Sequence, residues 1–336
     1  MAKQILGVDI GYNSLKLVLM NGRQIKKTAT APMPNKLIRA GRVVSTETMG
    51  ELIRSTMKAN GMRCGNAAIV FPNETVFVRN VTMPRMTADQ LAYNLPFEFR
   101  DYITDELKDY VFDYAMITTK EELETPPSEG ETNGAMELLA AAAPVSLMDE
   151  SRELLRKAGL KMVKAAPAVC SYQALIRDME KTGRGFGEYC ILDLGYQSIR
   201  MYMFKGDRHI VTRILEIGLS TLDEVIAEAY NVDVHLAHTY LLTNYEDCQN
   251  KQFCQNAYGN IAVEMMRALN FYRFSNPDSS LNDVWICGGG AMIEPLRAAI
   301  AETLDMTIHN GEELLPDGTG PEDGYALTQA VGITLE

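Results

Sequence analysis

A short stretch occurs twice in this chain and constrains its fold more than any other feature. LGVDIGYNSLKLVLMNG spans residues 6–22 and LDLGYQSIRMYMFKG spans residues 192–206. The two align without a gap at an offset of 184 residues, so that Asp9 matches Asp193 and Gly22 matches Gly206. Each copy has an apolar strand, an acidic residue and a glycine, small polar residues, and a second apolar strand, which is the pattern of a β-hairpin. Two copies half a chain apart predict two related domains.

The residues at the two turns suit a metal-bound phosphate. Gly11 and Gly195 allow a tight turn and a close approach of backbone N–H groups to a ligand, and successive turn amides can form a nest for an anion. Asp9 and Asp193 precede the turns, and Mg²⁺ needs only one or two protein carboxylates because it keeps several waters. Two facing hairpins would clamp a metal nucleotide between two domains. The alternative is a pair of ordinary hairpins with polar tips.

A third element follows the second hairpin. The apolar strand 283–287 runs into Gly288, Gly289 and Gly290, and Pro295 stands where a helix would begin. A strand, a glycine loop and a helix let main chain lie against a flat ring or sugar and direct a helix N-terminus toward anionic groups. A simple packing turn is the alternative interpretation.

Composition excludes several classes of protein. The net charge of −12 without clustered Lys and Arg argues against nucleic-acid binding. The apolar start of the chain is too short for a signal-peptide core, and the apolar run 138–148 contains Pro144 and is too short to span a bilayer. We therefore expect a soluble cytoplasmic protein without direct membrane insertion.

Cysteine and histidine patterns point to no cofactor of their own. The six cysteines include no CxxC pair, which favours buried free thiols. His235 and His238 have a spacing that could ligate a metal on a helix, but no third ligand accompanies them in the sequence.

Periodicity predicts the remaining elements. We expect helices at 46–61, 87–102, 146–159, 167–182, 233–244 and 252–274, and one after Ser220, capped by Ser220 with Asp223 or by Thr221 with Glu224. Strands at 75–84, 111–118, 136–143 and 161–166, together with two of these helices, predict a small α+β insert. The glutamate- and proline-rich segment 121–134 is predicted to be a solvated loop.

Three motifs in this order, DIGYNSLK, DLGYQSIR and ICGGGAM, resemble the phosphate-1, phosphate-2 and adenosine motifs of the actin-like ATPase superfamily. Within it the chain is most similar to the PilM family of type IV pilus assembly, which is related to the cell-division protein FtsA. VFVRNVTMP, NLPFEFRDYI, VCSYQAL, EIGLSTLDEVIAEAYNV and YALTQAVGITLE carry this second resemblance, which extends over essentially the whole chain.

The resemblance implies an α/β, bilobed actin-like fold, that is, a duplicated ribonuclease H-like ATPase fold with an FtsA/PilM-type α+β insert in the first lobe. Residues 1–74 with 165–186 would form the first lobe, 75–164 the insert, and 187–336 the second lobe with a helical subdomain at about 220–280. ATP or ADP with Mg²⁺ would bind between the lobes, and Asp9 and Asp193 would hold the metal through water.

The family motifs also imply the binding residues and a partner. The implied nucleotide-binding residues are Asp9, Gly11, Tyr12, Asn13, Ser14, Lys16, Asp193, Gly195, Tyr196, Gln197, Ser198, Gly218, Gly288, Gly289 and Gly290. Lys16 would reach a phosphate oxygen. The implied partner is a PilN-like cytoplasmic N-terminal segment of an inner-membrane pilus protein, bound between the insert and the first lobe. It would place this protein at the inner membrane, and self-association is a further expectation.

Some positions depart from the family pattern. Tyr12 and Tyr196 stand at turn positions that are usually small, and Ala166 stands where many actin-like enzymes carry a polar residue that positions water. Loss of that group would cost roughly 10²- to 10⁴-fold in hydrolysis rate, so these residues favour ATP binding over turnover. Alternatives are a pseudo-ATPase scaffold, a filament-forming FtsA-like protein, a type II secretion actin-like domain and a small-molecule kinase.

Overall fold

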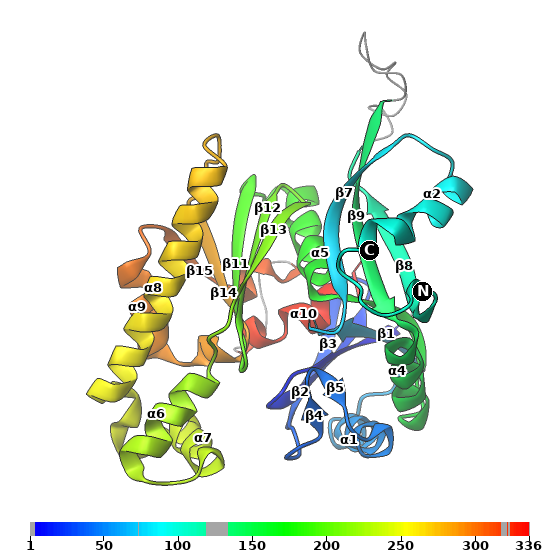
Figure 1. Cartoon of the computed structure of the whole chain (residues 1–336). Coiled ribbons are helices and arrows are strands. Elements are labelled where there is room, and N and C mark those ends of the chain that lie inside the picture. Colours follow the sequence, from blue (N-terminus) through cyan, green and yellow to red (C-terminus); the bar gives the residue numbers. More distant parts are fainter. Residues whose placement is uncertain (1–3, 73, 119–133, 317–320, 322, 336) are drawn as a thin grey trace.

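The computed structural model describes residues 4–72, 74–118, 134–316, 321 and 323–335 (Figure 1). Of the predicted loop at 121–134, only Gly134 falls within these residues.

Two five-stranded sheets with the same topology form the framework of the two lobes. In each sheet a three-stranded antiparallel meander continues through its first strand into two parallel strands, in the orders β3-β2-β1-β6-β10 and β13-β12-β11-β14-β15. The first sheet contains β1 (Gln4–Ile10), β2 (Ser14–Asn21), β3 (Gln24–Pro32), β6 (Asn66–Phe71) and β10 (Lys161–Pro167). The second contains β11 (Glu188–Leu194), β12 (Ile199–Lys205), β13 (Arg208–Leu215), β14 (Asp283–Cys287) and β15 (Thr307–Asn310).

The register of the two hairpins confirms the duplication that the repeat predicts. Asp9 lies opposite Lys16 in the β1–β2 pair, and Asp193 lies opposite Arg200 in the β11–β12 pair. The two acidic residues therefore occupy equivalent places at the end of the first strand of each lobe.

Two helices pack between the sheets and join the lobes. α5 (Ala168–Lys181) and α10 (Thr328–Gly332) lie side by side in the centre of the molecule (Figure 1). Their apolar side chains share one buried cluster with residues of both sheets, such as Val18 and Val70 of the first and Tyr202 and Trp285 of the second. The lobes thus meet through a continuous apolar core.

A smaller three-stranded sheet, which we call the insert, lies between β6 and β10 in sequence. Its strands are β7 (Phe77–Pro84), β9 (Ala135–Pro144) and β8 (Tyr110–Met116), in that spatial order. The helix predicted at 87–102 is wrong in its length, because α2 (Ala88–Asn94) gives way to the 3-10 turn η1 (Leu95–Phe99), and Pro96 cannot donate to an α-helical ladder. A short 3-10 turn, η2 (Leu107–Asp109), precedes β8.

The assignment of helix 146–159 and strand 161–166 to the insert is wrong. The helix, α4 (Val145–Lys157), packs on α1 (Thr46–Ala59), and a Cβ at Gly50 would crowd the Leu154 carbonyl and Lys157. The strand, β10, pairs in parallel with β6. Both belong to the first lobe, because β10 supplies the fifth strand that the duplicated sheet requires.

The remaining elements surround the second lobe and the first hairpin. They are the short strands β4 (Ile38–Arg39) and β5 (Arg42–Val43), helices α6 (Ser220–Tyr230), α7 (Val234–Thr243), α8 (Gln252–Ser275) and α9 (Glu294–Thr303), and the 3-10 turns η3 (Tyr245–Asn250), η4 (Gly289–Met292), η5 (Gly311–Leu314) and η7 (Gly324–Ala326). Of the helices in the described part of the chain, none combines the length and apolar character that crossing a membrane requires.

Substitution of Gly7 tests the close packing of α10 on the first sheet. A Cβ at Gly7 would overlap the Ala330 carbonyl oxygen, so Gly7→Ala should lower the free energy of unfolding by about 1–3 kcal/mol. Gly259 lies in α8 with open space around it, and Gly259→Ala should raise stability by about 0.5–1 kcal/mol. Denaturant unfolding of the two variants beside the wild type measures both effects, and equal behaviour would contradict the packing.

Candidate functional site

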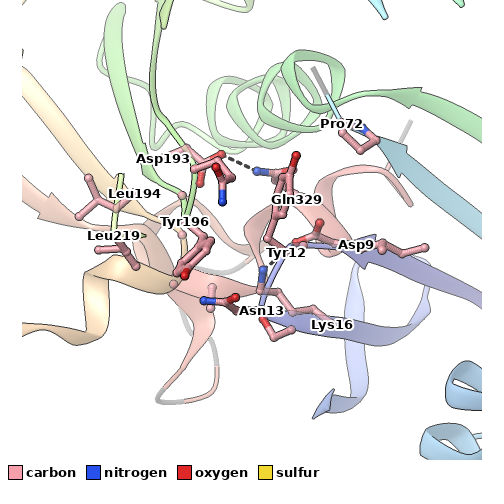
Figure 2. A pocket seen from close by; sticks show the side chains of 18 of the residues that line it. Asp9, Tyr12, Asn13, Lys16, Pro72, Asp193, Leu194, Tyr196, Leu219 and Gln329 are labelled. Atoms are coloured by element: carbon pink, nitrogen blue, oxygen red, sulfur yellow. Dashed lines mark hydrogen bonds and ion pairs between the residues drawn. The ribbon is translucent and has the colours of Figure 1, made fainter. Parts of the chain in front are cut away.

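A cavity of about 490 Å³ lies between the lobes, where the two hairpin turns face each other (Figure 2). This size is typical of small-molecule sites. The cavity brings together thirteen of the fifteen predicted residues, namely Asp9, Gly11, Tyr12, Asn13, Ser14, Lys16, Asp193, Gly195, Tyr196, Gln197, Ser198, Gly288 and Gly289. Residues more than 180 positions apart therefore share one site.

The first hairpin presents a tight, well-bonded turn. The Gly11 amide donates to the Ser14 carbonyl at 3.0 Å, and Lys16 Nζ donates to Asp9 Oδ2 at 3.1 Å. The Tyr12 hydroxyl accepts a hydrogen bond from the Gly41 amide at 2.8 Å. Tyr12 is thus anchored by its hydroxyl to the β4–β5 turn of its own lobe.

The turn of the first hairpin also reaches the second lobe. Asn13 Nδ2 lies 3.3 Å from Nε2 of His238 on α7, and the other ring nitrogen of His238 lies 2.9 Å from Oδ2 of Asp223 on α6. This chain of polar contacts crosses the cleft. His238 is engaged by Asn13 and Asp223, and His235, one turn earlier on α7, is exposed.

The second hairpin turn caps helix α6 directly. The carbonyls of Gly195 and Tyr196 accept hydrogen bonds from the amides of Leu219 and Ser220 at 3.1 and 2.9 Å. The predicted capping boxes of Ser220 with Asp223 and of Thr221 with Glu224 are therefore wrong, since no side chain caps this helix. Asp223 is instead fully buried beneath the turn.

Tyr196 packs beside this buried carboxylate. Its ring meets the His238 ring edge-on with centroids 5.7 Å apart. Burial, with the nearby Asp223 carboxylate, raises the pKa of the Tyr196 hydroxyl well above its ordinary value. The phenol therefore stays neutral and acts as a packing group and hydrogen-bond donor on the wall of the cavity.

Asp193 is the most strongly perturbed carboxylate of the site. It is 5% exposed and accepts a 2.7 Å hydrogen bond from Gln329 Nε2, which also donates to the Tyr172 hydroxyl at 3.3 Å. Burial raises its pKa to about 6, and neighbouring Asp9 adds to the rise, while Lys16 and the Gln329 hydrogen bond oppose it. A buried carboxylate of this kind favours a proton or a cation.

The glycine loop after β14 completes the cavity. Gly288 has a left-handed φ of 84°, and a Cβ there would crowd Asp193 and the backbone of Leu194. Gly289 has open space beside it.

Gly218 and Gly290 are not among the lining residues. A Cβ at Gly218 would overlap the Tyr196 carbonyl, and one at Gly290 would crowd Leu194 and Leu219. These two glycines allow close packing behind the wall of the cavity, and their contact with nucleotide stays a prediction.

Several residues of the site were missed by sequence reasoning. Arg200, Glu74 and Gln329 line the cavity, and His238 and Asp223 join the lobes through Asn13. The repeat already aligns Arg200 with Lys16, which was the available signal for that residue. The other residues lie outside the three motifs.

Duplicated sheets with two hairpins and a glycine loop around one cleft define a protein of actin-like ATPase fold, as predicted. The chain belongs to the family described as type IV pilus assembly protein PilM, whose family model matches residues 7–310.

Comparison with solved structures agrees with this fold. A PilM-PilN type IV pilus biogenesis complex is 23% identical, with 98% of this chain and 97% of that chain covered and a TM-score of 0.81. The ethanolamine utilization protein EutJ from Carboxydothermus hydrogenoformans is 14% identical, with 100% and 90% covered and a TM-score of 0.61. MreB 5 of Spiroplasma citri bound to AMPPNP is 10% identical, with 99% and 95% covered and a TM-score of 0.50. A comparison with curated proteins gives no match.

Removing the charge of Asp193 should stabilise the ligand-free protein. Since its folded-state pKa is raised from 3.8 to about 6, its contribution to stability is fully present below pH 4 and lost as the pH rises to 6. Asp193→Asn should therefore raise the free energy of unfolding at pH 7.5 by up to about 3 kcal/mol, and the gain should shrink toward pH 4.5. Thermal unfolding at both pH values measures this, with the exposed Asp278→Asn as control. A gain that does not depend on pH would contradict it.

Proposed function

We propose that this protein is a nucleotide-binding scaffold of type IV pilus assembly, which holds ATP and Mg²⁺ between its lobes and docks a short segment of an inner-membrane partner. One observation carries the proposal. Two equivalent hairpins, one from each lobe, and the loop at Gly288 and Gly289 converge on a single cavity. Such convergence suits a ligand that has an anionic end and a flat apolar end.

The residues present fit a metal nucleotide. Asp9 and Asp193 would hold a hydrated Mg²⁺, which would neutralise phosphate charge, and Lys16 would contact a phosphate oxygen. The backbone at 11–14 and 195–198 would bind phosphates, and Gly288 with Gly289 would line the adenosine. Arg200 supports the fit, because its Nε is buried without a hydrogen-bond partner among the described residues.

Holding ATP is favoured over hydrolysing it. Ala166 pairs with Val70 inside the first sheet and carries no group that could orient water. Gln329 does reach the cavity, but its Nε2 is already bonded to Asp193 and Tyr172. We infer that nucleotide acts by stabilising the closed arrangement of the lobes, which sets the shape of the partner site.

The proposed partner is a PilN-like cytoplasmic N-terminal segment of an inner-membrane pilus protein. The structural relative is a PilM-PilN complex, and this supports the same kind of partner here. We place the docking groove between the insert and the first lobe, so that the protein works at the cytoplasmic side of the inner membrane, with self-association as a further property.

Nucleotide binding should be visible as a thermal shift. ATP with Mg²⁺ at about 100 times its Kd should stabilise the wild type by roughly 2.7 kcal/mol. Asp9→Ala and Asp193→Ala should lose most of this gain and weaken binding of a PilN-like peptide, while Asp278→Ala should behave as the wild type. Absence of any shift in the wild type, with peptide binding intact in both cavity variants, would exclude nucleotide control.

A further inference from the structure

The two hairpins are equivalent in register but not in their ion pairs. In the first, Lys16 bonds to Asp9, the residue opposite it. In the second, Arg200 is opposite Asp193, but Asp193 accepts from Gln329 instead. Arg200 reaches across the cleft and forms an ion pair with Glu74, which follows the first-lobe strand β6. The two hairpins therefore differ in the partner of their cation: Lys16 pairs within its own hairpin, and Arg200 pairs with a residue outside its hairpin.

Arg200 is set up to accept a further anionic partner. Its side chain is 11% exposed and lines the cavity, and its Nε has no hydrogen-bond partner among the described residues. A guanidinium has five N–H donors in a planar fork, and one carboxylate cannot satisfy all of them. Buried donors without acceptors are unfavourable, so an incoming phosphate would gain by bonding here.

Glu74 stands in the link that leads into the insert. The first-lobe strand β6 ends at Phe71, and the insert strand β7 begins at Phe77. Within this link the Thr75 amide and hydroxyl both donate to the Pro72 carbonyl, at 3.0 and 2.7 Å. The Glu74 side chain is 34% exposed, so water can replace Arg200 as its partner.

We propose that Arg200 is a polyphosphate ligand that pairs with Glu74 when no nucleotide is bound, and that its transfer from Glu74 to a nucleotide phosphate frees the link into the insert. The inference rests on the proposed nucleotide binding and deepens it, because it names the contact through which nucleotide bound in the cleft would change the link to the insert. A phosphate group offers Arg200 more charge and more acceptor oxygens than one carboxylate does.

Other contacts hold the insert to the second lobe independently of the cavity. Asn80 Nδ2 donates to the carbonyls of His209 and Ile210 at 3.1 and 3.0 Å, and Arg208 pairs with Glu137. None of these residues lines the cavity. Loss of the Arg200–Glu74 pair would therefore loosen the link at 74–76 while the insert stays attached.

Nucleotide titrations of three variants test the exchange of partners. Glu74→Gln removes the competitor and should tighten ATP–Mg²⁺ binding about 2- to 5-fold. Arg200→Gln removes the ligand and should weaken it about 10- to 100-fold. Arg208→Gln is the matched control, because it removes an insert contact outside the cavity, and it should leave the affinity unchanged.

Hydrogen exchange supplies the second readout. ATP–Mg²⁺ should speed amide exchange at 74–77 in the wild type, and Glu74→Gln should show the fast exchange without nucleotide. If Arg200→Gln fails to fold, the Glu74→Gln affinity and exchange decide the question. The inference is overturned if both Glu74→Gln and Arg200→Gln bind nucleotide with wild-type affinity, or if nucleotide does not change amide exchange at 74–77. Either result leaves the proposed function standing. A wild type that binds no nucleotide overturns this inference and the proposed function together.

Discussion

The packing of α5 and α10 between the two sheets is the constraint on which the rest of the structure depends (Figure 1). Gly7 lets α10 approach β1 to the point where a single methyl would overlap its backbone, and Gly332 does the same against α5. Because the interior is close-packed, these contacts and the apolar cluster shared with the second sheet hold the two sheets together. The two hairpin turns face each other across a cavity of defined size for this reason.

Charge in that cavity follows from the same arrangement. Among the described lining residues, Asp9, Glu74, Asp193 and Asp323 are acidic, and Lys16 and Arg200 are basic. The two cations form ion pairs with Asp9 and Glu74, whereas Asp193 accepts a hydrogen bond from the amide of Gln329. Its pKa is raised because the cost of burial exceeds the opposing effects of nearby Lys16 and of the Gln329 hydrogen bond. A divalent cation bound beside it would stabilise its ionised form, so the proposed binding of a metal nucleotide would also stabilise the cleft.

Local patterns predicted most elements but not their partners. The strand Asp283–Cys287 and the long helix after Gln252 lie where periodicity placed them. Strand 161–166 was also predicted, yet it was assigned to the insert, because the local pattern of a strand does not specify which sheet it joins. Asp223 shows the same limit in a side chain. A serine followed three residues later by an acid is a capping pattern, but here tertiary contacts with His238 and the second hairpin turn bury the acid.

The site was predictable in so far as it repeats. Both acidic residues and both turns could be read from the two aligned copies, whereas Glu74 and His238 come from elements that share no motif with their partners. Duplication produces two equivalent cations, Lys16 and Arg200, but sequence equivalence cannot say that only one of them crosses the cleft. That asymmetry has a physical consequence. When Lys16 binds a ligand, the contact that changes is within its own hairpin, whereas for Arg200 it is the ion pair with Glu74 across the cleft. Of the two cations, only Arg200 can therefore couple occupancy of the cleft to the link that leads into the insert, as we propose.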